Sequence, residues 1–151
     1  MLGTLLPGVQ HLQNIHPLIV HFPIALLPVS GLFYLLGWLT GKESCGWTAL
    51  WLLGLGTLGA AAAVATGLYG AEGVMVAPSV REHLLLVHER IMLAVLGLSV
   101  VLLVWASIAR PMPSKGGVVF LILLAILSAS LAAGADFGLR MVYDYNAGGD
   151  A

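Results

Sequence analysis

Charged residues are scarce in this chain. Its 151 residues include only six Lys and Arg and seven Asp and Glu, which is 9% of the total. A soluble domain of this length needs many more charged side chains to cover its surface. Hydrophobic residues make up 60% of the chain, and the mean hydropathy is +1.01. The composition therefore predicts an integral membrane protein that is associated with the lipid bilayer.

Cysteine and basic residues are also few, and each shortage excludes a class of protein. The single cysteine, Cys45, excludes an internal disulfide and a Cys-rich metal or iron–sulfur site. The net charge of -1 provides no basic stripe for nucleic acid. No HExxH spacing occurs, which excludes a zincin, and no Ser or Cys nucleophile arrangement is present. We therefore assign no catalytic residue.

Four apolar stretches are each long enough to cross the hydrocarbon core of a bilayer, which takes about 20 residues. The segments that join them are rich in Gly, Pro, Ser and charge, as turns are. Short connections make sequential helices antiparallel neighbours, so the predicted fold is an all-α, four-transmembrane-helix bundle in a single domain, residues 1–151. The predicted spans are Leu18–Leu39, Trp47–Tyr69, Leu84–Ile108 and Val118–Phe137.

The loop charges predict an orientation. Lys42, Arg110 and Lys115 lie on one side, and Arg81 and Arg140 lie on the other. By the positive-inside rule, both termini are expected on the periplasmic side of a bacterial membrane. The first fifteen residues carry no Lys or Arg, so we expect no cleavable signal peptide and a first span that directs insertion. Residues 1–15 themselves could form an interfacial helix or be frayed.

Four of the five histidines belong to two copies of one phrase. Residues 16–21 read HPLIVH and residues 83–88 read HLLLVH, and the offset between them is 83 − 16 = 67. The same offset aligns Gly67 with Gly134, within ridges of small residues on the second and fourth spans. The chain therefore reads as two repeated helical hairpins, with all four histidines in one leaflet. Histidines five residues apart do not share a helix face, but His21 and His88 are expected to face each other at equal depth.

Two imidazoles at one level on different helices are what a b-type haem needs. We therefore predict His21 and His88 as axial ligands, with the small-residue ridges at Gly67 and Gly134 forming a flat slot. Arginines at the same end of the bundle are candidate partners for the haem propionates, because arginine pairs well with carboxylates. These arginines are Arg81, Arg90 and Arg140.

Other readings of the same residues stay open. His16, His83 and Glu89 are candidates for a second cofactor contact or for proton exchange with quinol, or they are ordinary interfacial residues. His21 and His88 could instead bind copper or zinc, or form a structural hydrogen bond across the bundle. Glycine and alanine ridges are also typical of plain helix packing. A cofactor-free assembly subunit and a metal-binding or transport protein are therefore the two alternatives to a cytochrome.

Residues 16–27, HPLIVHFPIALL, closely resemble the opening signature of a family of predicted four-span bacterial membrane proteins, domain of unknown function 2231. The end of the chain, FGLRMVY at 137–143, is also similar, although Tyr145 stands where the family tends to have a histidine. The resemblance implies a bacterial inner-membrane protein, often found beside c-type cytochrome or other redox modules. Together with the histidines, it favours an electron-transfer subunit that links quinone to a periplasmic redox partner within a larger complex, rather than a complete enzyme.

Overall fold

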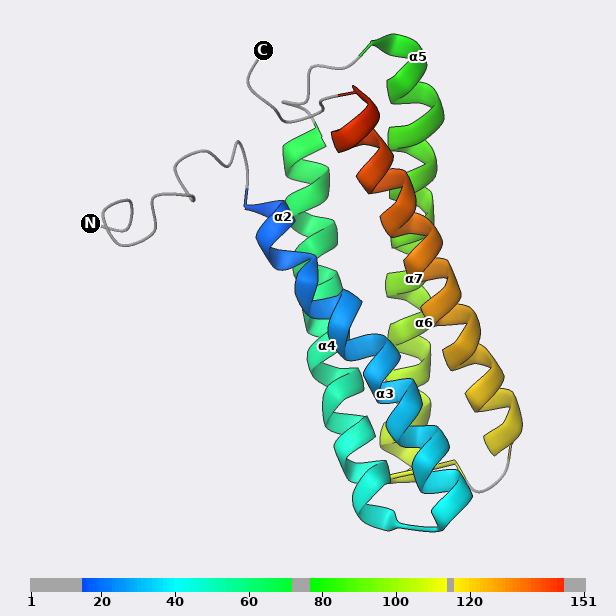
Figure 1. Cartoon of the computed structure of the whole chain (residues 1–151). Helices are drawn as coiled ribbons and strands as arrows, with labels where there is room; N and C mark the ends of the chain where they lie inside the picture. The colour runs from blue at the N-terminus through cyan, green and yellow to red at the C-terminus, as the bar shows by residue number, and fades with distance from the viewer. Residues whose placement is uncertain (1–14, 72–76, 114–115, 146–151) are drawn as a thin grey trace, which may run out of the picture.

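The protein is all-helical in a computed structural model, which describes residues 15–71, 77–113 and 116–145 (Figure 1). The side chains of Val80 and Arg81 also fall outside the description, as does most of the predicted interfacial segment at residues 1–15. The helices are α2 (His16–Ile19), α3 (His21–Thr40), α4 (Glu43–Ala71), α5 (Pro78–Val80), the π-helical turn η2 (Arg81–Leu85), α6 (Leu86–Ala109) and α7 (Gly117–Tyr145).

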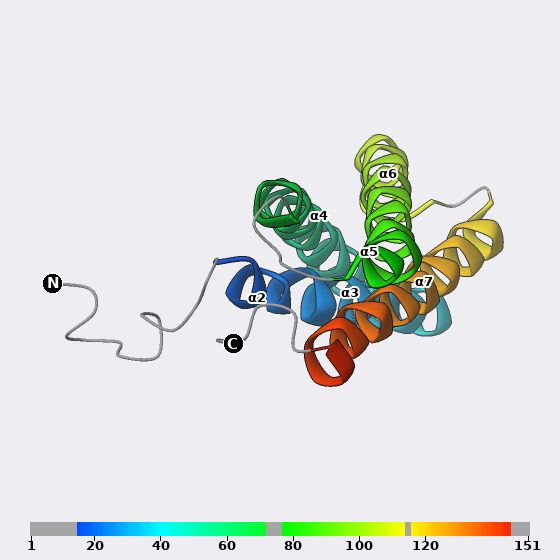
Figure 2. The ribbon, with the colours of Figure 1, turned by 90° about the horizontal axis from the view of Figure 1, so that it is seen from above.

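The four long helices form a bundle in which each helix occupies one corner. Helix α3 packs against α4 and α7, and α6 packs against the same two helices, so α3 and α6 occupy opposite corners. Figure 2 shows this arrangement from above. The short helix α2 lies against α4 and continues the line of α3. We call the end of the bundle that carries α2, α5 and η2 the histidine end, and the end that carries Trp38 and Trp105 the tryptophan end.

Four helices are long and apolar enough to cross a membrane, which confirms the predicted fold class. They cover His16–Thr40, Glu43–Ala71, Glu82–Ala109 and Gly117–Tyr145, somewhat more than the predicted spans. Only 22% to 33% of the most apolar stretch of each is buried inside the bundle. The outward side chains, such as Leu32, Leu58 and Val101, are large and apolar and suited to contact with lipid tails.

Proline divides the first span. Pro17 occupies the first turn of α2, where its missing N–H is not needed. Pro23 has no N–H to donate to the carbonyl of Ile19, and the regular helix is interrupted at Val20, between α2 and α3. At the other end, α3 stops at Gly41, whose φ of 68° is a left-handed conformation that glycine adopts without strain.

Helices α3 and α4 lie close together because glycines on α4 leave room for α3. A Cβ atom on Gly56 would come within 2.9 Å of Cγ of Leu27, and one on Gly59 within 3.2 Å of Cδ of Pro23. Both contacts are closer than real Cβ atoms ordinarily make. In a bilayer, where lipid tails are as apolar as the helix surface, such close packing is what holds helices together.

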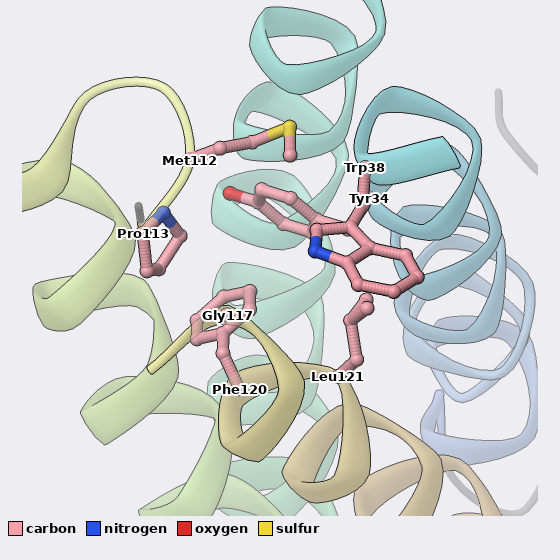
Figure 3. A pocket seen from close by; sticks show the side chains of 7 residues that line it. All are labelled: Tyr34, Trp38, Met112, Pro113, Gly117, Phe120 and Leu121. Carbon is pink, nitrogen blue, oxygen red and sulfur yellow. The ribbon is translucent and has the colours of Figure 1, made fainter. Parts of the chain in front are cut away.

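The tryptophan end is filled by aromatic side chains. The ring of Phe120 makes edge-to-face contacts with Tyr34, at 4.9 Å between centroids, and with Trp105, at 5.4 Å. Tyr34 is fully buried, and its hydroxyl has no hydrogen-bond partner among the described residues. It lines a cavity of about 10 Å³ together with Met112 and Phe120, shown in Figure 3. No titratable group other than Tyr34 lines this cavity, so we place the candidate functional site at the other end.

Candidate functional site

His16 is held against α4. Its Nδ1 atom lies 3.2 Å from Oγ1 of Thr66. The Thr66 hydroxyl lies 2.9 Å from the Ala62 carbonyl, to which it donates its single proton, so the same oxygen is able to accept from Nδ1–H of His16. The ring lies over Gly67, where an added Cβ would come within 3.0 Å of Cε1. Thr66 and Gly67 thus fix the position of a half-buried imidazole on the inward face of α2.

His88 is held against α7 in a comparable way, but by the backbone. Its Nδ1 atom lies 2.7 Å from the carbonyl oxygen of Gly134. A carbonyl only accepts, so Nδ1 carries the proton and the neutral ring keeps its lone pair on Nε2. The ring is half-buried and lies over Gly138, where a Cβ would come within 3.3 Å of Cε1. This tautomer is the one that a histidine needs to bind a metal or accept a proton through Nε2.

Among the described residues, His16 and His88 are the two half-buried histidines, and both lie at the histidine end. They come from the first and third spans, which occupy opposite corners, while α4 and α7 flank them on the two other corners. Both flanking helices present small residues at this level, because Gly67 lies beside one ring and Gly138 beside the other. The structure therefore turns two histidines toward neighbouring helices, His16 toward α4 and His88 toward α7, rather than the predicted His21 and His88 toward each other.

The predicted facing of His21 and His88 is wrong. His21 is exposed on the outer surface of α3, and so is its neighbour Phe22. His83 is also exposed, on η2. The expectation that histidines five residues apart occupy different faces agrees with both halves, but the inward histidine is the first of the pair in one half and the second in the other. The cofactor roles predicted for His21 and His83 remain untested predictions.

The two phrases turn different histidines inward because the first and third spans differ in register. The fully buried Leu27 and Val95 occupy corresponding places in α3 and α6, and their offset is 95 − 27 = 68. Tyr34 and Leu102 show the same offset, 102 − 34 = 68. The extra residue lies after η2, because His88 is seven residues before its buried counterpart (95 − 88 = 7), whereas His21 is six residues before its own (27 − 21 = 6). One residue of difference rotates the histidine phrase by about 100° relative to the core, so the two phrases turn different members inward.

The even-numbered spans keep the predicted offset of 67. The buried residues Leu53 and Ala60 of α4 match Phe120 and Leu127 of α7, with 120 − 53 = 67 and 127 − 60 = 67. The sequence offset therefore holds for half of the helices only. It is correct for the small-residue ridges, and it is one residue short for the helices that carry the histidines.

The predicted slot at the two glycines is occupied by side chains. The His16 ring fills the space beside Gly67. Beside Gly134, a Cβ would collide with the terminal methyl of Met92 and come within 2.9 Å of Cγ2 of Ile91. Both glycines are therefore sites of close approach, as predicted, but in this structure the approach is made by protein side chains.

An open cleft of about 290 Å³ lies at the histidine end. Arg140 contributes a half-exposed side chain, whose Nε atom is 3.8 Å from Oδ2 of Asp144 and whose guanidinium carbon is 6.0 Å from the centroid of the Phe137 ring. The lining residues are Ser79, His83, Leu84, Arg140 and Tyr145, from α5, η2 and α7.

The remaining predicted residues do not join this cleft. Arg90 is exposed and Glu89 is half-buried on α6, and neither lines the cleft. The side chain of Arg81 lies outside the described part of the chain. Cys45 is at the tryptophan end. Among the described residues, no group of three or more His, Cys, Asp or Glu is placed to hold a metal ion.

Sequence reasoning missed Thr66 and Tyr145. Thr66 precedes Gly67 in the small-residue ridge, and a hydroxyl next to a glycine that approaches a histidine is a signal that could have pointed to it. Tyr145 lies at the last described position of α7, and its entry into a cleft with His83 depends on tertiary packing alone.

The sequence comparisons agree with this architecture. No curated protein and no solved structure matches the chain. The model of a family described as predicted membrane protein, DUF2231, matches residues 12–151, which include all four long helices and both histidine phrases. The chain is therefore a multi-pass membrane protein that belongs to the DUF2231 family.

Proposed function

We propose that this protein is a membrane electron-transfer subunit that binds a b-type haem between its helices at the histidine end. The observation that carries the proposal is the hydrogen bond from Nδ1 of His88 to the Gly134 carbonyl, which leaves Nε2 as the lone-pair nitrogen of a half-buried ring. Because His21 is exposed and His16 is half-buried, His16 and His88 are the two histidines that would hold the haem iron. Haem, when bound, supplies the one-electron chemistry.

The residues around the pair are compatible with a flat ligand. The two rings come from opposite corners of the bundle, and glycines of α4 and α7 lie beside them. Met92 covers Gly134, and its unbranched thioether side chain adapts to a new neighbour more easily than a β-branched residue does. Hydrogen bonds donated by the two Nδ1 atoms to the Thr66 hydroxyl and the Gly134 carbonyl orient the rings, which is the usual arrangement for histidines that ligate iron.

The wider role follows from the same proposal. Haem near one membrane surface, in a small subunit, is suited to pass electrons between a lipid-soluble quinone and a redox partner in the periplasm, such as a c-type cytochrome. The bacterial inner membrane, with both termini in the periplasm, is the location that this role requires. Arg140 and Arg90 remain candidate partners for haem carboxylates, and His83 and Glu89 remain candidates for proton exchange with quinol.

The test is the absorption spectrum of the protein purified in mild detergent from cells supplied with haem. We expect a Soret band and, on reduction, sharp α bands. His16→Ala and His88→Ala should each abolish the spectrum of the six-coordinate haem, while His21→Ala and His83→Ala, the matched controls from the same two phrases, should retain it.

Each other outcome selects a different function. A Soret band lost in His21→Ala but kept in His16→Ala would overturn the pairing and restore the one expected from sequence. Colourless protein with bound copper or zinc by elemental analysis would favour the metal-binding alternative. Colourless, metal-free protein would mean that the two histidines hold the helices together in a cofactor-free assembly subunit.

A further inference from the structure

The cleft at the histidine end is lined by polar side chains that have no hydrogen-bond partner. Within the described part of the chain, Ser79, His83, Arg140 and Tyr145 make no hydrogen bond with other residues. All four can donate, and Arg140 is positively charged. The buried side chain of Leu84 also lines the cleft. The four polar side chains are exposed along the cleft, where they offer hydrogen-bond donors and one positive charge to a ligand that supplies several acceptor oxygens.

The charge of Arg140 is only weakly compensated. Its contact with Asp144 is 3.8 Å long, joins half-exposed side chains, and involves Nε rather than the terminal nitrogens. Such an exposed pair at positions i and i+4 contributes little. The two terminal nitrogens therefore remain available to donate to an oxyanion, and a guanidinium does so with two parallel hydrogen bonds.

The position of the cleft in the fold limits the kind of ligand that it can bind. It lies where α7 and η2 reach the end of their membrane-spanning segments, which is the level of lipid headgroups. A π-helical turn, a feature that is common at functional sites, provides His83. The volume of about 290 Å³ is at the lower end of the range for small-ligand sites.

We propose that this cleft binds a phosphate group, through Arg140, His83 and Tyr145. The phosphate belongs either to the headgroup of an anionic phospholipid or to a small soluble phosphate ester. Binding needs no haem, so the proposal stands or fails independently of the electron-transfer function.

The experiment uses the full chain, free of haem, in neutral detergent. Native mass spectrometry measures the bound fraction as phosphatidylglycerol or phosphatidylcholine is added, and a second series adds glycerol 3-phosphate or inorganic phosphate. We expect phosphatidylglycerol to bind, and Arg140→Gln to weaken it about fivefold, the effect of one arginine near an anionic headgroup. His83→Gln and Tyr145→Phe should weaken it less. Arg90→Gln is the control, because Arg90 is an exposed arginine of the same end that does not line the cleft.

The outcomes of the experiment distinguish a lipid phosphate from a soluble phosphate, and they include results that would overturn the proposal. Competition by glycerol 3-phosphate at low concentration assigns the site to a soluble ester, whereas binding of the lipid alone assigns it to a headgroup. Equal weakening by Arg90→Gln and Arg140→Gln would reflect general attraction to anionic lipid and overturn the proposal. Phosphate binding unchanged in Arg140→Gln and Tyr145→Phe, both folded by circular dichroism, would overturn it as well.

Discussion

The two hairpins of the bundle carry the same histidine phrase, but each turns a different member of it inward. In the first hairpin, the leading residue, His16, is half-buried and His21 is exposed. In the second hairpin, the leading residue, His83, is exposed and His88 is half-buried. A repeat in the sequence therefore does not make its members equivalent in space. One additional residue in a helix is enough to exchange their roles, because it rotates a segment by about 100°.

The inward histidines also differ in how they are held. His88 donates to a backbone carbonyl, which fixes the proton on Nδ1. His16 donates from Nδ1 to the Thr66 hydroxyl, whose own proton goes to the Ala62 carbonyl. The tautomer of His88 is thus set by a backbone carbonyl, whereas that of His16 is set by the orientation of the Thr66 side chain. If the two rings share a ligand, the second hairpin provides the more rigid half of the site.

Removing one residue from η2 should turn the leading histidine inward in both hairpins, and this is the largest effect that we expect. Deletion of Leu85 would restore α-helical geometry, so that His83 takes the inward direction now occupied by the buried Leu84. In the parent protein, diethylpyrocarbonate should modify His21 and His83 rapidly and His16 and His88 slowly. In the deletion variant, His83 should become protected, as measured by peptide mass spectrometry. An unchanged pattern of modification would show that the π-helical turn does not control the register.

Two helix glycines, Gly56 and Gly97, offer a second comparison, because a neighbouring helix packs closely on the first and not on the second. Gly56→Ala places a Cβ within 2.9 Å of Cγ of the fully buried Leu27, and should destabilise the protein by about 1–3 kcal/mol, as overpacking of a rigid interior does. Gly97→Ala is the control, because nothing lies within 4 Å of a Cβ there. It should be neutral or slightly stabilising, since alanine favours a helix. The measurement is thermal unfolding in detergent, and equal melting temperatures for both variants would contradict close packing at Gly56.

The fold was accessible from sequence because long apolar stretches and breaker residues determine it locally. The candidate site was accessible only in part. The offset of 67 correctly aligned the ridges of α4 and α7, since both helices are regular, and it singled out His88 and Gly134. The same offset did not identify which histidines point inward. The direction of a histidine side chain depends on the number of residues between it and the core. His21 lies six residues before the buried Leu27 (27 − 21 = 6), His88 lies seven residues before the buried Val95 (95 − 88 = 7), and no residue type in the two phrases indicates this difference.

The tyrosine of the first hairpin can be compared with the leucine at its corresponding position. Tyr34 and Leu102 are both fully buried, but the hydroxyl of Tyr34 has no partner within the described part of the chain. Tyr34→Phe removes this polar group while it keeps the edge-to-face contact with Phe120, and we expect stability to rise by about 1 kcal/mol. Leu102→Ala, the control, should lower stability because it leaves a cavity. A lower melting temperature for Tyr34→Phe would mean that the hydroxyl is satisfied, for example by a water molecule in the adjoining cavity.

We expect the smallest effect for the hydrogen bond between His16 and Thr66. Its acceptor belongs to a side chain, so a substitution can remove it, whereas the acceptor for His88 is a backbone carbonyl. Thr66→Val keeps the shape of the side chain but removes the acceptor for Nδ1 of His16. Interhelical hydrogen bonds in membranes contribute about 0.6 kcal/mol on average. A double-mutant cycle of Thr66→Val with His16→Ala should therefore give a coupling energy of about this size. Thr66→Ser, which retains the hydroxyl, should show little change. A coupling near zero would mean that contact with Gly67, rather than the hydroxyl, positions His16. In the second hairpin no side-chain substitution removes the Gly134 carbonyl, so His88 should keep its orientation in every one of these variants.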